Sequence, residues 1–97
     1  MYRLEVSPAA DRDLERLKKR IQRHDFERLR ATIRGLADEP RPHGVRKIER
    51  VDKAYRIRVG SYRVVCEIYD NENLALILQV VRRTETTYGL PPENRST

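Results

Sequence analysis

The chain has 97 residues, of which 37% are charged, and its formal net charge is +6 at pH 7. A chain of this length encloses one hydrophobic core, so a second domain is excluded. The longest uninterrupted apolar run, residues 74–78, is far shorter than the roughly twenty residues that span a bilayer. The N-terminus has no apolar signal segment, and the single cysteine, Cys66, has no partner for an internal disulfide, so we expect a cytoplasmic protein without membrane contact.

The positive charge is concentrated in one part of the sequence. Residues 40–63 carry eight basic and two acidic side chains, a net charge of +6, whereas residues 8–39 carry nine basic and seven acidic side chains, a net charge of +2. A basic surface of this kind attracts polyanions such as nucleic acid. We therefore expect residues 40–63 to form the anion-binding surface.

The first half of the chain predicts a short strand followed by two helices. Residues 2–6 alternate polar and apolar side chains, as in a strand, and Ser7 supplies a helix N-cap that is followed by proline. Apolar residues recur at helical spacing in residues 8–21 and again in residues 26–36, with Asp25 as the expected N-cap of the second helix. Two amphipathic helices joined so closely form a helical hairpin whose apolar side needs a sheet to cover it.

The second half of the chain predicts three antiparallel strands. Residues 55–59 alternate apolar and polar side chains, the Gly-Ser pair that follows supplies a two-residue turn, and residues 62–69 form the return strand. Residues 70–73 form a second turn, and residues 74–81 are nearly all apolar, as expected for a central strand.

Together these elements predict an α+β fold of a single compact domain. An N-terminal strand precedes a helical hairpin that packs on one face of an antiparallel sheet, in the order β-α-α-β-β-β. The domain is expected to cover residues 1–88, with residues 89–97 as a C-terminal tail.

The expected hairpin places arginines together. A two-residue turn puts Arg58 opposite Arg63, and opposed residues share a face, so Arg56 joins them on the side that the helices leave open. Like charges directly opposite each other destabilise a strand pair, which favours an anion held between them. Guanidinium groups bind phosphate oxygens in bidentate geometry. The alternative, an exposed face that uses arginine only for solubility, would be expected to mix in acidic residues.

Two arginines and a tyrosine follow the last strand. Only one of Arg82 and Arg83 can share the face of the first three arginines: a four-residue turn before the strand favours Arg82, and a bulge or a turn of odd length favours Arg83. Nearby positive charge favours a phenolate at Tyr88, which could then act as a general base. RNA supplies its own nucleophile, the 2′-hydroxyl, so arginines and one tyrosine suffice to cleave it without a metal. The alternative role of Tyr88 is to pack a short tail.

The run from Ala54 to Val65, AYRIRVGSYRVV, is followed by LQVVRR and a tyrosine, and this combination resembles the RelE toxin family of toxin–antitoxin modules. The resemblance implies a ribosome-dependent mRNA endonuclease that cleaves mRNA in the A site by 2′-hydroxyl attack, with no metal and no cofactor. In such toxins the basic residues of the hairpin hold the phosphate, the last strand supplies a general acid or leaving-group stabiliser, here favouring Arg83, and Tyr88 matches the general base. The expected catalytic residues are Arg56, Arg58, Arg63, Arg83 and Tyr88, and the expected substrate-binding residues are Arg46, Lys47 and Arg82.

The same resemblance implies the partners. These are a cognate RelB-like antitoxin, the ribosome and mRNA, with DNA contacted only indirectly through the antitoxin. Two alternatives remain open: a non-nucleolytic inhibitor of DNA gyrase like the ParE toxins, which share the architecture, and a plain basic RNA-binding module. The joint presence of Arg63, Arg83 and Tyr88 favours the nuclease.

Overall fold

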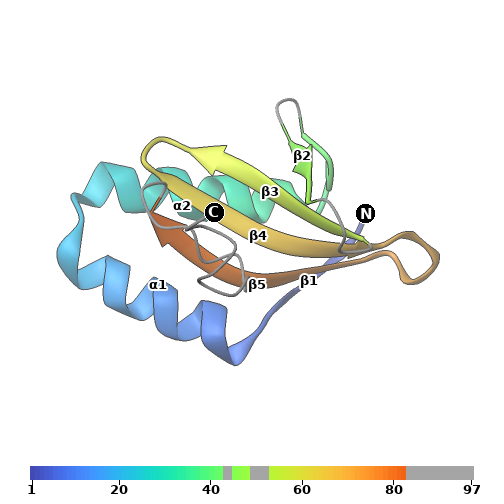
Figure 1. Ribbon diagram of the computed structural model, residues 1–97, viewed down its shortest axis with the longest axis horizontal. Coiled ribbons are helices and arrows are strands. Elements are labelled where there is room, and N and C mark those ends of the chain that lie inside the picture. Colours follow the sequence, from blue (N-terminus) through green and yellow to red (C-terminus); the bar gives the residue numbers. More distant parts are fainter. Residues whose placement is uncertain (43–44, 49–52, 83–97) are drawn as a thin grey trace, which may run out of the picture.

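Two helices cover one face of a five-stranded sheet (Figure 1). The structure is a computed structural model that describes residues 1–42, 45–48 and 53–82. Its elements are, in chain order, β1 Arg3–Val6, α1 Pro8–Arg20, α2 Arg23–Gly35, β2 Arg46–Lys47, β3 Ala54–Val59, β4 Tyr62–Tyr69, the 3₁₀ turn η1 Asp70–Glu72, and β5 Leu74–Arg82. The predicted α+β class and element order are confirmed, and β2 is an additional strand of two residues.

The sheet is mixed. Its strands lie in the order β1-β5-β4-β3-β2, and β1 runs parallel to β5 while the other neighbours are antiparallel. The sequence predicts an antiparallel sheet because two of its connections are tight turns, which join only antiparallel strands. β1 can lie parallel to β5 because both helices and the strands β2, β3 and β4 separate the two in the chain, so no tight turn joins them.

Ser7 fixes the start of α1. Its hydroxyl oxygen accepts a hydrogen bond from the Ala10 amide at 3.1 Å, as an N-cap does, and the same hydroxyl donates to the Leu78 carbonyl of β5 at 2.9 Å. One side chain therefore both caps the helix and ties it to the sheet.

We expect Ser7→Ala to lower the free energy of unfolding by about 0.5–2 kcal/mol, because the helix loses its cap. Urea denaturation followed by circular dichroism measures the loss. Ser7→Thr keeps both the donor and the acceptor and should remain close to wild type. Equal destabilisation by the two substitutions would show that the hydroxyl is not what holds this helix end.

The second helix begins earlier than the sequence predicts. Its N-cap is Gln22, in extended conformation, and Asp25 lies inside the first helical turn instead of capping it. Because Ile21 already turns the chain at the end of α1, one further extended residue is enough before the next helix starts. An acidic residue in the first turn interacts favourably with the positive end of the helix dipole, so Asp25 stabilises α2 from within.

The turn between β3 and β4 depends on glycine. Gly60 has a φ of +58°, a backbone conformation that residues other than glycine rarely adopt. A Cβ at this position would also lie 3.3 Å from the guanidinium of Arg28 in α2. The expected two-residue turn is confirmed, because Val59 lies directly opposite Tyr62.

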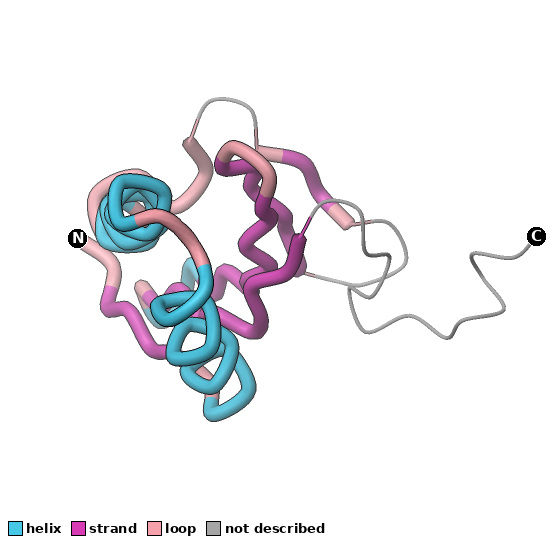
Figure 2. The backbone as a smooth tube through the Cα atoms, turned by 90° about the vertical axis from the view of Figure 1, so that its left-hand side faces the viewer, coloured by secondary structure: helices cyan, strands magenta, loops and turns pink. Residues whose placement is uncertain are grey.

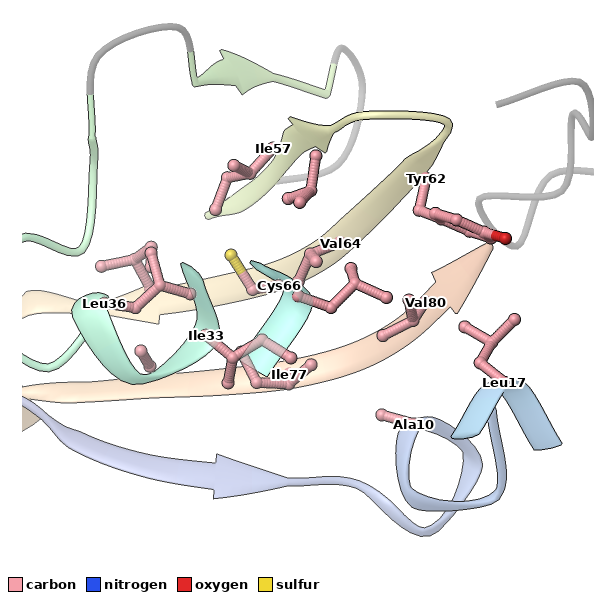
Figure 3. Close-up of a cluster of buried hydrophobic side chains, with 14 residues drawn as sticks. Ala10, Leu17, Ile33, Leu36, Ile57, Tyr62, Val64, Cys66, Ile77 and Val80 are labelled. Atoms are coloured by element: carbon pink, nitrogen blue, oxygen red, sulfur yellow. The ribbon is translucent and has the colours of Figure 1, made fainter. Parts of the chain in front are cut away.

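The core lies between the helices and the sheet. Figure 2 shows both helices on the same side of the strands, and Figure 3 shows the apolar side chains that fill the space between the two layers. Leu29 of α2 and Leu36 at the C-terminal cap of that helix are completely buried there, as are Val64 and Ile77 of the sheet. Cys66 belongs to this cluster, and burial raises the pKa of its thiol to about 12, so the thiol is unreactive at neutral pH. Neither helix in the described residues has the length and apolar character needed to cross a membrane.

Candidate functional site

Two pairs of arginines face each other on the side of the sheet that the helices leave uncovered. Arg58 of β3 lies directly opposite Arg63 of β4, as the sequence predicts. Arg56 of β3 lies opposite Arg46 of β2, which adds a second pair. Opposed residues share a face, and the alternate positions of β3 and β4 belong to the helix-covered core, so all four arginines lie on the open face. We call this group the arginine face; it consists of Arg46, Arg56, Arg58 and Arg63.

The arginine face is reachable by a ligand. Arg46 and Arg58 are exposed, and Arg56 and Arg63 are half-buried. Two like-charged pairs directly opposite each other in neighbouring strands cost stability, by an amount comparable to the roughly 0.2–1 kcal/mol that a favourable cross-strand pair contributes. A phosphate between two guanidinium groups offsets this repulsion, because it accepts two hydrogen bonds from each planar group.

A β-bulge in β5 determines which residues of that strand share the arginine face. Val65 of β4 lies opposite Gln79. The next residue, Cys66, lies opposite Ile77, so Leu78 is an extra residue on β5. The α1 segment holds the bulge on both sides, because Ser7 binds the Leu78 carbonyl and the Asp13 carboxylate accepts a hydrogen bond from the Val80 amide at 2.9 Å.

The bulge places Arg82 on the helix side of the sheet. Arg82 lies opposite Tyr62, a core residue, and its guanidinium carbon is 5.8 Å from the centre of the Tyr62 ring. The residue before it, Val81, lies opposite Arg63 and therefore shares the arginine face. The structure thus separates Arg82 from the arginines with which the sequence grouped it. A bulge is the case in which the sequence favours Arg83, and not Arg82, for the arginine face.

Lys47 is also separated from the arginine face. It lies opposite Tyr55, which packs against the core, and so it points to the other side of the sheet from Arg46. There it lines an open cavity of about 270 Å³ together with Arg41 and Lys53. Arg46 therefore lies on the arginine face, whereas Lys47 lies on the opposite side of the sheet, in this cavity.

A polar network holds the segment that precedes β2. The Asp70 carboxylate accepts a hydrogen bond from Arg41 at 2.7 Å and another from the Tyr2 hydroxyl. The Arg41 guanidinium in turn lies over the Tyr55 ring, 5.1 Å from its centre. This network links the N-terminus, the segment after α2 and the turn before β5, and no signal in the sequence pointed to it.

The network predicts a dependence of stability on pH. The hydrogen bonds from Arg41 and Tyr2 lower the pKa of Asp70 below its ordinary value. A carboxyl group whose pKa is lowered in the folded state stabilises the fold above its unfolded pKa of about 3.9 and loses that contribution as the pH falls through the folded value. We therefore expect Asp70→Asn to unfold at lower urea concentration than wild type at neutral pH. The difference should shrink as the pH falls below about 4, and a difference independent of pH would contradict the network.

Two of the expected catalytic residues, Arg83 and Tyr88, lie outside the described residues. Within residues 1–42, 45–48 and 53–82, no group of three or more His, Cys, Asp or Glu side chains is placed to hold a metal ion. The described part of the site presents the guanidinium groups of paired strands, and such groups can bind a phosphodiester and stabilise negative charge on it.

The fold and the arginine face together define a small sheet protein, covered by a helical hairpin, whose open face is suited to a polyanion. A family model described as ParE toxin of type II toxin–antitoxin system, parDE, matches residues 4–87. The chain belongs to this family, within the RelE/ParE superfamily, and is thus a toxin of a toxin–antitoxin module. Among curated protein sequences, none matches the chain at a significant level.

Solved structures share the fold. The chain is similar to the toxin in the archaeal RelE–RelB complex from Pyrococcus horikoshii OT3, with a TM-score of 0.72 and 23% identity over 88% of this chain and 98% of that one. It is similar to a chain of the RelBE2 toxin–antitoxin complex from Mycobacterium tuberculosis, with a TM-score of 0.69 and 24% identity over 84% and 98% of the two chains. The chain is also similar in fold to a chain of the E. coli DinJ–YafQ complex, with a TM-score of 0.72 and 12% identity over 87% and 96% of the two chains. At these identities the similarity establishes the fold.

Proposed function

We propose that this toxin is a ribosome-dependent endonuclease that cleaves mRNA in the ribosomal A site. The observation that carries the proposal is the arginine face, where Arg58 stands directly opposite Arg63 beside the Arg46–Arg56 pair. Two opposed pairs of like charges destabilise the fold, whereas a phosphodiester bound between them would offset the repulsion. The similarity to toxins of RelE–RelB complexes supports the same reading.

In the proposed reaction the RNA provides the nucleophile. Tyr88 accepts the proton of the 2′-hydroxyl, and the resulting oxyanion attacks the adjacent phosphorus. Arg56, Arg58 and Arg63 hold the non-bridging oxygens and stabilise the additional negative charge of the transition state. The 5′-oxygen leaves as Arg83 protonates or stabilises it, giving a 2′,3′-cyclic phosphate and a 5′-hydroxyl. The register of β5 supports Arg83 for this role, because Arg82 lies on the helix side.

Arg46 extends the proposed site along the RNA. It stands at the outer strand of the sheet, opposite Arg56, and is exposed. We assign it to the phosphate that neighbours the reacting one, because binding one phosphate further along fixes the register of the strand without touching the chemistry.

The proposed partners follow from the class of the toxin. A RelB-like antitoxin would bind and neutralise it, since similar chains occur in the RelE–RelB complex and in the RelBE2 toxin–antitoxin complex. The ribosome would present the mRNA. We propose the cytoplasm as its location, because both mRNA and ribosomes are there.

A second candidate is a non-nucleolytic inhibitor of DNA gyrase. The match of residues 4–87 to the ParE toxin family model favours it. The arginine face argues for the nuclease, because an inhibitor that only binds a protein surface has no need of opposed arginines.

The test adds the purified toxin to ribosomes programmed with a defined mRNA, in the presence of EDTA, and maps the mRNA ends. We expect wild type to cleave within the A-site codon and Arg83→Ala and Tyr88→Phe to lose most of that activity. Intact mRNA with wild type, together with inhibition of gyrase supercoiling in a parallel assay, would establish the second candidate instead. Cleavage that Tyr88→Phe does not reduce would remove the assigned general base.

A further inference from the structure

A second basic surface lies on the helix side of the same end of the sheet. Arg16 and Arg20 of α1 and Arg82 of β5 line one open cavity of about 380 Å³, together with Tyr62 and Gln22. All three arginines are exposed. We call this the helix-side cavity, and the arginine face does not include it.

The positive charge of the helix-side cavity is only partly neutralised. Arg16 is paired with Asp13 at 2.9 Å, and Asp25 is an acidic residue of the lining. Within the described ranges, neither Arg20 nor Arg82 has a carboxylate partner within 4.0 Å. Two guanidinium groups are therefore available to an anionic ligand.

Arg82 also offers a flat surface. Its guanidinium is supported from one side by the Tyr62 ring, 5.8 Å away, and the residue itself is exposed. Single-stranded RNA is bound by guanidinium planes and aromatic rings on which unpaired bases stack, alongside charges that hold its phosphates. The cavity thus combines the two features that such a strand requires.

The two basic surfaces meet at the end of the sheet. Arg63 and Tyr62 are consecutive residues of β4, and the first faces the arginine face while the second faces the helices. The turn at Gly60 closes this end, with the Arg28 guanidinium beside it. Because Arg82 lies directly opposite Tyr62, the residue next to Arg63 in β4, an RNA strand that leaves Arg58 and Arg63 can reach Arg82 at this end of the sheet.

We propose that the helix-side cavity binds the phosphodiester backbone of the single-stranded RNA that continues beyond the arginine face, with one base stacked on Arg82. This proposal rests on the proposed function, because it concerns RNA held at the arginine face. It adds a site for a flanking segment that takes no part in the chemistry, so it should raise affinity for long RNA and leave binding of short RNA unchanged.

The experiment measures binding of 2′-O-methyl oligoribonucleotides, which cannot be cleaved through the 2′-hydroxyl, to the full chain by fluorescence anisotropy. A trinucleotide covers the arginine face alone, and a dodecanucleotide can reach both surfaces. We expect Arg20→Gln/Arg82→Gln to bind the dodecanucleotide about tenfold or more weakly and the trinucleotide as wild type does. The slope of log affinity against log salt should fall by about 0.7 for the long RNA, since Arg20 holds a phosphate while Arg82 stacks on a base, and each lost phosphate contact on a single strand contributes about 0.7.

The matched control is Lys18→Gln/Arg30→Gln, which removes the same charge from a different groove of the helical hairpin. Equal loss with the control, or no loss with Arg20→Gln/Arg82→Gln, would overturn the helix-side cavity as a site. Arg20→Gln alone repeats the test without disturbing the contact between Arg82 and Tyr62. Arg58→Gln should weaken both oligonucleotides, and no effect of that variant on either would instead count against the arginine face and the proposed function.

Discussion

Replacing Arg58 by glutamine is expected to reduce the rate of mRNA cleavage on the ribosome about 10²–10³-fold, because removal of one well-placed donor to a transition-state charge typically has that effect. Glutamine keeps much of the side-chain length and loses the charge and the paired donors that match a phosphate. Quantifying cleaved mRNA in single-turnover reactions measures the loss directly.

The fold should not suffer from this change. Arg58 is exposed and stands opposite another arginine, so its replacement removes a repulsion, and the free energy of unfolding should stay the same or rise by up to about 1 kcal/mol. Arg12→Gln, on the exposed side of α1, makes the same change of charge away from the arginine face and should cleave as wild type does. If Arg58→Gln retained full activity, or if Arg12→Gln lost as much, the role of the arginine face would be refuted.

The largest expected loss of stability follows from Leu29→Ala. Leu29 is completely buried in the layer between α2 and the sheet, and removing a leucine side chain from such a site costs about 2–5 kcal/mol. A domain of this size has a total stability of about 5–15 kcal/mol, so the melting temperature should fall by more than about 10 °C. Differential scanning calorimetry measures the shift.

The control for this substitution is Val6→Ala in β1. Val6 is 43% exposed, so Val6→Ala should lower the free energy of unfolding by well under half as much as Leu29→Ala. A small effect of Leu29→Ala would mean that α2 does not pack on the sheet as described.

The hairpin of β3 and β4 could be predicted from the sequence because its signals are local. A glycine at the turn fixes the loop length, the loop length fixes the register, and the register places Arg58 opposite Arg63. The alternation of apolar residues then determines which face the helices cover. For these reasons the fold class and the centre of the arginine face followed from residue spacing alone.

The bulge in β5 could not be predicted in the same way. Residues 74–81 are nearly all apolar, so no alternation marks Leu78 as the extra residue, and the side chains that hold the bulge, Ser7 and Asp13, lie some seventy positions earlier in the chain. The placement of Arg82 on the helix side depends entirely on this distant contact.

Short and mixed elements were missed for related reasons. β2 has two residues, too few to show a period, so the pairing of Arg46 with Arg56 and the separation of Lys47 were not predictable. The parallel direction of β1 depends on which edge of the sheet it joins, and local patterns carry no information about that choice.

The central claim is that the arginine face holds a phosphodiester which the RNA itself attacks. Its most direct test uses programmed ribosomes whose mRNA carries 2′-deoxyribose throughout the A-site codon and ribose elsewhere. We predict that the toxin leaves this codon intact while it cleaves the all-ribose mRNA and leaves a 2′,3′-cyclic phosphate on the upstream fragment. Cleavage of the deoxyribose codon at an undiminished rate would contradict the account.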